Sequence, residues 1–331
     1  MRKALIVSLF PLMVFAADFD LGLEAYSKGD YSKAIEIWMP LASEGDMHAQ
    51  NNIGVMYDKG FGFPRNHTLA FQWFEKAAIQ GHLSSQFNIA RMYQKGEGVR
   101  KNPERALYWY SLAAEQGLAD AQYNLALMYG KGDGVEPSHQ LAMEWFSRAA
   151  EQNHAPTQYE IGTIFFTGRG VDKDEKLGIE WIGKAAKQKY PEAVYHMSFL
   201  YQLGWGVKED EEKGMRLLRS AAKLGHPRAQ ADLGAWYSLD GDQDIATWWF
   251  RKSAEQGYDL AQFELGARYA TGQGIEKNNL KGFMWIILAA EQGYQAAIES
   301  RRNMMRAHST SFHALAIERA VECGLKGYKD C

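Results

Sequence analysis

Small, aliphatic and aromatic residues recur four positions apart along most of this chain. A small residue, usually alanine, is followed four positions later by an aliphatic residue and four positions after that by an aromatic one. Residues four apart share one face of an α-helix, so each copy of the pattern predicts a helix with a buried stripe. The copies begin at Ala49, Ser85, Ala121, Thr157, Ala193, Ala229, Ala261 and Ala297, in steps of 36 residues apart from one step of 32.

A second helix is predicted within each copy. In six copies the first helix (helix A) is followed by Gly-x-Gly and a hydrophobic residue, as in Gly132 to Val135. Glycine adopts the left-handed conformation that ends helices, so this segment predicts a reversal of the chain. A tryptophan and an Ala-Ala pair then define helix B. We expect these tryptophans to face the core: Trp73, Trp109, Trp145, Trp181, Trp249 and Trp285.

A constant period of this length predicts a solenoid of stacked helix pairs, because one pair cannot bury its own apolar face. The predicted fold is all-α, an α/α superhelical solenoid in one continuous array. We expect a capping helix pair over residues 17–48, seven repeats over residues 49–296, and capping helices over residues 297–331. In the last segment, Ser311 is the expected N-cap of the final helix.

The combination Ala-Gln-x-x-Leu-Gly-x-x-Tyr, Gly-x-Gly-Val, Ala-x-x-Trp and Ala-Ala-x-x-Gly resembles the Sel-one-like repeat family, relatives of tetratricopeptide repeats. The likeness extends from Asp20 to Gln295. It implies that helix A lines a concave wall and helix B a convex one. It also implies an adaptor for protein complexes, often at the cell envelope.

The N-terminus has the three parts of a secretory signal. Arg2 and Lys3 precede an apolar run that ends at Phe15, and small residues follow. We expect a signal peptide over residues 1–16, with cleavage between Ala16 and Ala17. The run of about 12 apolar residues is shorter than the roughly 20 that a transmembrane helix needs, which argues against stable membrane insertion. The predicted location is the periplasm or the medium of a Gram-negative bacterium.

Charge and cysteine content narrow the function further. The net charge is −3, and a nucleic-acid-binding protein should carry a basic stripe, so nucleic acid is not an expected partner. The two cysteines, Cys323 and Cys331, lie close together near the C-terminus, and in an oxidising compartment we expect them to form a disulfide.

Catalytic patterns do not emerge from the sequence. The Gly-x-Gly segments follow predicted helices and lack the strand and the Lys-Ser/Thr of a phosphate loop. His82, His154 and His226 fall in loops two repeats apart, too far from one another to bind one metal ion. We therefore predict no enzyme activity, metal or cofactor. The alternatives are a β-lactam or peptidoglycan hydrolase, as in cysteine-rich members of the family, and a secreted factor that acts on a host.

Numbered from the small residue as position 1, positions 4 and 8 of helix A vary between repeats while the other positions of the pattern stay nearly constant. By the family likeness they line the concave groove, where asparagine can bind a peptide backbone and methionine offers adaptable apolar contact. An equally weighted interpretation is that both positions simply pack. Position 4 is Asn52, Asn88, Asn124, Glu160, His196, Asp232 and Glu264, and position 8 is Met56, Met92, Met128, Ile164, Leu200, Trp236 and Arg268. The leading prediction is a scaffold that binds proteins or peptides there.

The repeat that begins at Ala229 is four residues shorter than the others and lacks Gly-x-Gly. It also holds two unusual tryptophans. We expect Trp236 to be a binding hot spot and Trp248 to fill the space left by the missing loop residues. Two loop tips carry large aromatic residues, Phe61 and Trp205, which either contact a partner or cover the adjacent loop.

Overall fold

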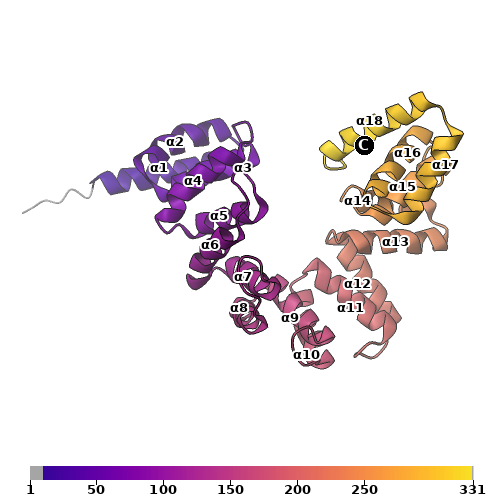
Figure 1. Ribbon diagram of the computed structural model, residues 1–331, viewed down its shortest axis with the longest axis horizontal. Helices are drawn as coiled ribbons and strands as arrows, with labels where there is room; N and C mark the ends of the chain where they lie inside the picture. The colour runs from indigo at the N-terminus through magenta and orange to yellow at the C-terminus, as the bar shows by residue number, and fades with distance from the viewer. Residues whose placement is uncertain (1–9, 330) are drawn as a thin grey trace, which may run out of the picture. The chain divides into compact units, whose positions relative to one another are not determined.

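The computed structural model describes the backbone of residues 10–329 and of Cys331, and the side chains from residue 19 onward except residue 330. All regular elements in this part of the chain are α-helices (Figure 1). The first eight are α1 (Phe10–Ser27), α2 (Tyr31–Glu44), α3 (Met47–Lys59), α4 (His67–Ile79), α5 (Leu83–Lys95), α6 (Pro103–Glu115), α7 (Ala119–Lys131) and α8 (His139–Glu151). The rest are α9 (Ala155–Thr167), α10 (Glu175–Lys187), α11 (Pro191–Leu203), α12 (Glu211–Lys223), α13 (Pro227–Asp240), α14 (Gln243–Ala254), α15 (Asp259–Thr271), α16 (Asn279–Glu291), α17 (Gln295–Ala307) and α18 (Thr310–Leu325).

Contacts divide the chain into two compact units, residues 1–157 and 158–331, where the sequence predicts one continuous array. Within each unit the helices pack largely in sequence order, as a solenoid of helix pairs requires, and α16 also contacts α18. The odd-numbered helices from α3 to α15 are the predicted A helices, and α4 to α16 are the B helices.

The helix ends follow the predicted turn chemistry. Gly60, Gly96, Gly132, Gly204 and Gly272 adopt the left-handed conformation directly after an A helix, which confirms their role as terminators. Most B helices begin with a side-chain N-cap, which accepts a hydrogen bond from an otherwise unpaired backbone N–H. These caps are Asn66, Asn102, Ser138, Asp174, Asp210 and Asn278.

Two of the loop histidines cap A helices. Nδ1 of His82 accepts from the backbone N–H of Ser85, and Nδ1 of His226 accepts from that of Ala229. An accepting Nδ1 carries no proton, so both rings are neutral in this role. Burial lowers the pKa of both imidazoles from the ordinary 6.5, which agrees with neutral rings.

The second loop glycine fits against the preceding repeat. A methyl group at Gly98 would lie 2.2 Å from the backbone oxygen of His67, at the start of α4. At Gly134 it would meet Pro103 at the start of α6. Only a residue without a side chain allows the backbones this close, so these two loops rest on the N-terminus of the previous B helix.

The core lies between the helices of each pair and between adjacent pairs. Positions 1 and 5 of helix A are buried as predicted, with Ala49 and Ile53 both 0 % exposed. The small residue at position 6 admits a large side chain from helix B. At Gly54, for example, an added methyl would lie 2.7 Å from the Phe74 ring.

The helix-B tryptophans lie at the core as predicted, and Trp73, Trp145 and Trp249 pack against it while remaining partly exposed. Trp109 and Trp285 are buried, and Trp181 is partly buried. The following residue fills the core as well. This buried series is Phe74, Tyr110, Phe146, Ile182, Leu218, Phe250 and Ile286. Three of the partly exposed indoles carry a cation over the ring, from Lys76, Arg148 and Lys184.

Helices flank the repeats at both ends of the array, α1 and α2 before them and α17 and α18 after them. At the N-terminal end Trp38 is 1 % exposed, and its indole N–H donates to the backbone oxygen of Phe19. The predicted signal peptide includes residues 1–9, which lie outside the described residues, and the side chains of Ala16 and Ala17 are not described either.

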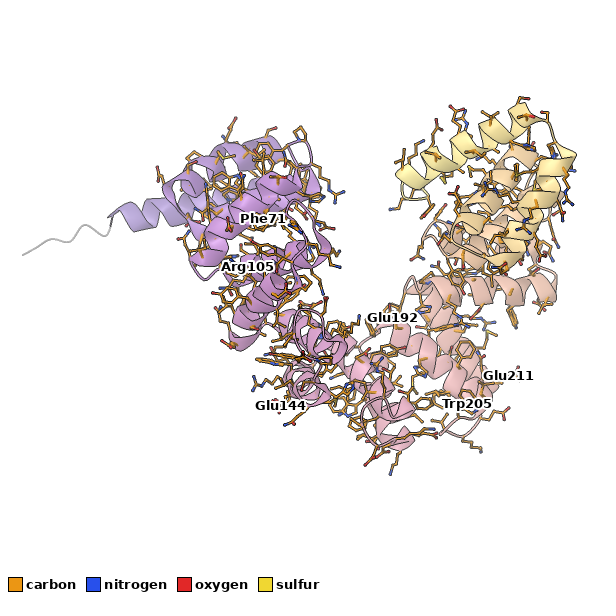
Figure 2. The ribbon with its side chains drawn as sticks, in the orientation of Figure 1. Phe71, Arg105, Glu144, Glu192, Trp205 and Glu211 are labelled. Carbon is orange, nitrogen blue, oxygen red and sulfur yellow. A yellow bond between two sulfur atoms is a disulfide. The ribbon has the colours of Figure 1, made fainter. Side chains whose placement is uncertain are left out.

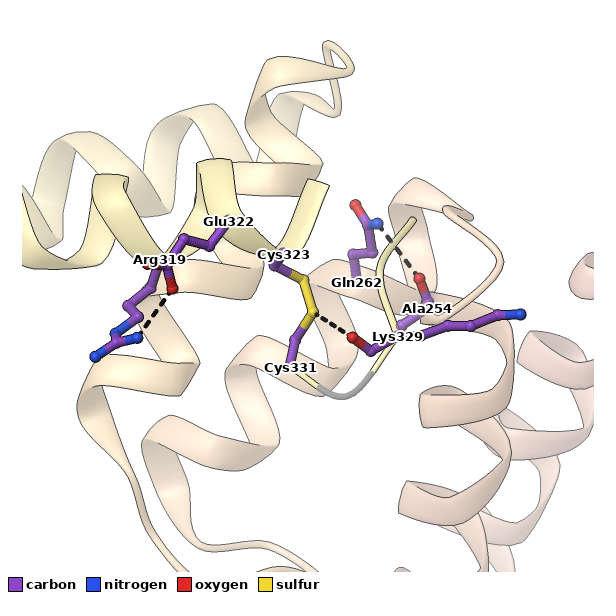
Figure 3. Close-up of a disulfide and its surroundings, with 7 residues drawn as sticks. All are labelled: Ala254, Gln262, Arg319, Glu322, Cys323, Lys329 and Cys331. Carbon is purple, nitrogen blue, oxygen red and sulfur yellow. Dashed lines mark hydrogen bonds and ion pairs between the residues drawn. A yellow bond between two sulfur atoms is a disulfide. The ribbon is translucent and has the colours of Figure 1, made fainter. Parts of the chain in front are cut away.

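At the C-terminal end, Cys323 and Cys331 are joined by a disulfide (Figure 3). The bridge belongs to the core that α14, α15 and α16 form with α18, and Cys323 is 2 % exposed. The N-cap of α18 is Ser309 and not the predicted Ser311, because the helix begins two residues earlier than the pattern suggested.

Candidate functional site: the exposed face of the A helices

One stripe of each A helix avoids burial. It consists of positions 0, 4, 7 and 11, where position 0 precedes the small residue. Spacings of four, three and four keep these positions on one side of a helix. In the first unit the stripe, here the N-terminal face, is His48, Asn52, Val55, Lys59, Ser84, Asn88, Arg91, Lys95, Asp120, Asn124, Leu127 and Lys131. In the second unit the C-terminal face is Glu160, Thr163, Thr167, Glu192, His196, Phe199, Leu203, Arg228, Asp232, Ala235, Leu239, Leu260, Glu264, Ala267 and Thr271.

Position 8 does not belong to this face. Met56 and Met92 are 0 % exposed and Met128 is 1 % exposed, and Ile164 and Leu200 are buried as well. The burial supports the packing interpretation for these five residues and leaves no methionine sulfur for a partner. The four-residue spacing that links positions 4 and 8 turns slightly past the exposed stripe, whereas position 7 remains on it.

Position 4 is partly exposed in every repeat. In the first unit it is always asparagine, and the three amides have different surroundings. Asn52 lines a small pocket of ≈ 100 Å³ with Val55, Tyr26 and Trp38. Asn124 donates through Nδ2 to the backbone oxygen of Asp120 at 2.7 Å. The asparagines therefore keep hydrogen-bonding capacity at the surface, because each amide has two donors and two acceptor sites.

In the second unit position 4 carries charge or an imidazole. Glu160 forms an ion pair with Arg169. His196 lies edge-on to the rings of Tyr159 and Phe166, and burial lowers the pKa of its imidazole. At the next repeat Asp232 accepts a hydrogen bond from the Tyr195 hydroxyl at 2.7 Å.

Arg268 is the exception at position 8, and it is 3 % exposed. Its guanidinium donates to the side chains of Ser238, Gln243 and Thr247 at 2.8 to 3.1 Å. These three residues belong to the shortened repeat, at the end of α13 and in α14. The guanidinium of the following repeat therefore occupies the place next to the missing loop. Burial raises the pKa of the nearby Glu264 carboxyl, and the charge of Arg268 opposes that rise.

The exposed Trp248 of the shortened repeat does not fill the space next to the missing loop residues. Trp248 is 50 % exposed, so the prediction that it compensates for the deletion is wrong. Its ring contacts Trp249 at a centroid distance of 4.6 Å. Trp236 is partly buried, with its ring 4.9 Å from that of Tyr237 and 5.2 Å from the Arg219 guanidinium. Its role as a hot spot stays a prediction.

The two aromatic loop tips differ. Phe61 stacks on Tyr31 at a centroid distance of 4.7 Å, so it covers the neighbouring helix pair. Trp205, in the loop after α11, is 60 % exposed (Figure 2). Only Trp205 of the two is therefore free to contact a partner.

A buried carboxylate cluster joins the first two repeats. Asp58 is 3 % exposed and faces His67 at 3.0 Å, Lys59 at 3.2 Å and Arg91 at 3.3 Å. Burial alone raises its pKa, and the surrounding donors and charges more than offset this, so the pKa is lowered. Asp58, His67 and Glu97 have the spacing of metal ligands. The two cationic side chains on Asp58 repel a metal ion, which favours a structural ion cluster.

A recurring pair of glutamines was not among the residues predicted from the sequence. Position 2 of helix A is glutamine in six repeats, and another glutamine follows at the end of helix B. Gln122, for example, donates to the backbone oxygen of Ala114 in the preceding repeat and accepts from Gln152. The other bonded pairs are Gln50–Gln80, Gln86–Gln116, Gln158–Gln188, Gln230–Gln256 and Gln262–Gln292. The repeat with Val194 has Leu224 in place of the second glutamine, so both partners are absent together.

Comparison with known proteins agrees with this architecture. The Sel1 repeat matches seven consecutive segments, residues 48–82, 83–118, 119–154, 155–190, 191–226, 227–258 and 259–294. The chain belongs to the Sel1 repeat family. Sel1 repeats are a protein-interaction fold, and proteins built from them are generally non-catalytic scaffolds. No curated protein matches this Sel1 repeat protein across its sequence.

Two solved structures resemble this Sel1 repeat protein closely in fold. A Sel1 repeat protein from Oxalobacter formigenes is 28% identical, with a TM-score of 0.62, over 92% of this chain and 96% of that one. The protein c5321, a protective antigen present in uropathogenic Escherichia coli strains, is 26% identical, with a TM-score of 0.56, over 95% of this chain and 78% of that one. Yeast Tom70, 13% identical with a TM-score of 0.52 over 87% of this chain and 63% of its own, shares the fold alone.

None of the described helices combines the length and the apolar character that crossing a bilayer requires.

Proposed function

We propose that this Sel1 repeat protein is an exported, non-catalytic scaffold that binds other proteins or peptides through the exposed face of its A helices. In this proposal it acts in the periplasm or outside the cell, where it assembles or regulates envelope complexes. The signal-like N-terminus supports the export, and the family supports the scaffold role.

The observation that carries the proposal is the contrast between the constant buried positions of helix A and its variable exposed positions. Positions 1, 5 and 6 hold nearly constant small or aliphatic residues, because they pack against neighbouring helices. Position 4 stays partly exposed and changes from asparagine to carboxylate to imidazole along the chain. Asparagine at Asn52, Asn88 and Asn124 offers donors and acceptors that match a peptide backbone.

The test is recovery of partners from an envelope extract, with mass spectrometry of the captured proteins. The variant Asn52→Ala/Asn88→Ala/Asn124→Ala removes the amides of the N-terminal face. Its matched control, Gln72→Ala/Tyr108→Ala/Glu144→Ala, changes the exposed position of the paired B helices. We expect the first variant to lose partners that the control retains, with both folded by circular dichroism. Equal recovery by the two variants would overturn the use of this face.

A further inference from the structure

The two faces have opposite charge, and neither follows the composition of its unit. Residues 17–157 hold 12 basic and 17 acidic residues, yet the N-terminal face carries four basic residues and one acidic residue. Residues 158–331 hold 23 of each, yet the C-terminal face carries four carboxylates and one arginine. The acidity of the C-terminal face is therefore not a by-product of an acidic unit.

Glu192 and Asp232 are the central carboxylates of the C-terminal face, on α11 and α13. Both act on the same imidazole, because each raises the pKa of His226 against the larger lowering effect of burial. The Oε2 atom of Glu192 is buried, and no group in the described part of the chain donates a hydrogen bond to it. A buried carboxylate oxygen without a donor is costly, and a cation from outside would satisfy it.

One aromatic ring lies beside Asp232. Tyr195 stacks on His226 at a centroid distance of 4.2 Å and donates its hydroxyl hydrogen to Asp232. The guanidinium of Arg228 lies 5.9 Å from the Tyr195 ring, within the range of a cation–π contact, and its charge acts on Asp232. The protein's own arginine thus shows that a guanidinium fits beside this ring and Asp232.

Taken with the proposed function, on which this step rests, the structure assigns the C-terminal face to a basic segment of a partner protein. Lysine or arginine side chains of the segment pair with Glu192 and Asp232. The occupant follows from charge complementarity and from the buried, unpartnered oxygen of Glu192. Arg228 competes for Asp232 from the edge of the site.

Fluorescence anisotropy tests this assignment on the full mature chain. The probes are a labelled peptide of alternating lysine and alanine and a matched peptide with glutamate in place of lysine. We expect saturable binding of the lysine peptide only. Glu192→Gln and Asp232→Asn should each weaken it about three- to tenfold, as expected for the loss of one partly desolvated ion pair. Arg228→Ala should strengthen binding, because it removes the competing cation.

The matched control is Asp120→Asn, which removes the carboxylate at the equivalent position 0 of the N-terminal face. Equal binding of both peptides, or an equal loss with Asp120→Asn and Glu192→Gln, would overturn the assignment. Self-association that Glu192→Gln abolishes, without peptide binding, would point to a second copy and also overturn it. If envelope partners still depend on Asn52, Asn88 and Asn124, the proposed function survives that failure.

Discussion

The A helices of residues 49–157 and of residues 158–271 share one backbone pattern and present different chemistry. Both sets end at left-handed glycines, and both bury positions 1 and 5. The first set repeats asparagine and lysine on its exposed face and methionine in its core, as in Asn88, Lys95 and Met92. The second set varies, with Asp232 on the face and Arg268 in the core.

This difference shows which positions packing constrains and which positions it leaves free to vary. Residues that contact adjacent repeats are nearly constant, because each change would create a cavity or a clash. Exposed positions change charge freely, since single surface substitutions have small effects on stability. Where a core position does change, as at Arg268, three partners in the shortened repeat change with it.

The sharpest test exchanges methionine and arginine at position 8. Met92→Arg places a cation without partners where the native side chain is 0 % exposed. We expect it to lower the free energy of unfolding by about 3–5 kcal/mol. Arg268→Met should cost about 1–3 kcal/mol, because it leaves buried acceptors unpaired but adds no charge. Urea denaturation followed by circular dichroism measures both. A larger loss for Arg268→Met than for Met92→Arg would contradict this view of the core.

The loop glycines give the next largest effect. Gly98→Ala should destabilise by about 2–3 kcal/mol, because its methyl group would overlap the backbone oxygen of His67. The control position Gly81 also has a positive φ but no atom within 4 Å of the new methyl group, so we expect Gly81→Ala to cost about 1 kcal/mol. Thermal melts of the two variants compare the clash with backbone strain alone. Equal losses would show that the contact between repeats is not tight.

The glutamine pairs predict a smaller effect with opposite signs in the two units. Gln122→Val should cost about 1–3 kcal/mol, because it leaves the buried Ala114 oxygen without its donor. In the second unit, the double variant Val194→Gln/Leu224→Gln should restore the missing pair and stabilise by about 0.5–1.5 kcal/mol. Hydrogen exchange at α10 and α11 reports the second change. Faster exchange there in the double variant would refute it.

The smallest expected effect is on pH dependence. The pKa values of His82 and His226 are lowered by burial, so the unfolded chain binds protons first as the pH falls below about 6.5. Stability is therefore full above that pH and is lost below it. His82→Asn and His226→Asn keep an N-cap acceptor that does not titrate. We expect the melting temperature of each variant to fall less than that of the native chain when the pH is lowered from about 7.5 to about 5. An unchanged loss would exclude these caps as its source.

Much of the fold was predictable, because periodicity reports directly which residues are buried. The start of each repeat, the terminating glycines and the close approach at Gly54 all follow from local pattern. The partial exposure of several helix-B tryptophans did not follow, since Trp73 and Phe74 are adjacent large apolar residues and sequence alone does not choose which of the two is buried more deeply. The pattern also grouped position 8 with position 4, where a rotation of part of a turn separates buried Met92 from partly exposed Arg91.

The candidate site was less predictable, because it depends on partners distant in sequence. Asn52 and Asp232 were identified as exposed variable positions. The bond from Tyr195 to Asp232 joins residues 37 positions apart, and the orphaned oxygen of Glu192 is visible only in three dimensions. The glutamine pairs left a readable signal, a second glutamine 30 residues after the first in five of six cases, and that regularity would have revealed them.

The contact between a loop glycine and the preceding repeat has a consequence for how such a chain can gain or lose residues. Gly274 rests on the backbone of Gln243 at the start of α14, although the repeat that supplies α14 has lost four residues from its own loop. This contact between repeats therefore depends on the position at which helix B begins and not on the length of the loop before that helix. Whole repeats can therefore be duplicated or deleted, and a loop can be shortened within a repeat, while a loop glycine of the next repeat still contacts the start of the preceding helix B.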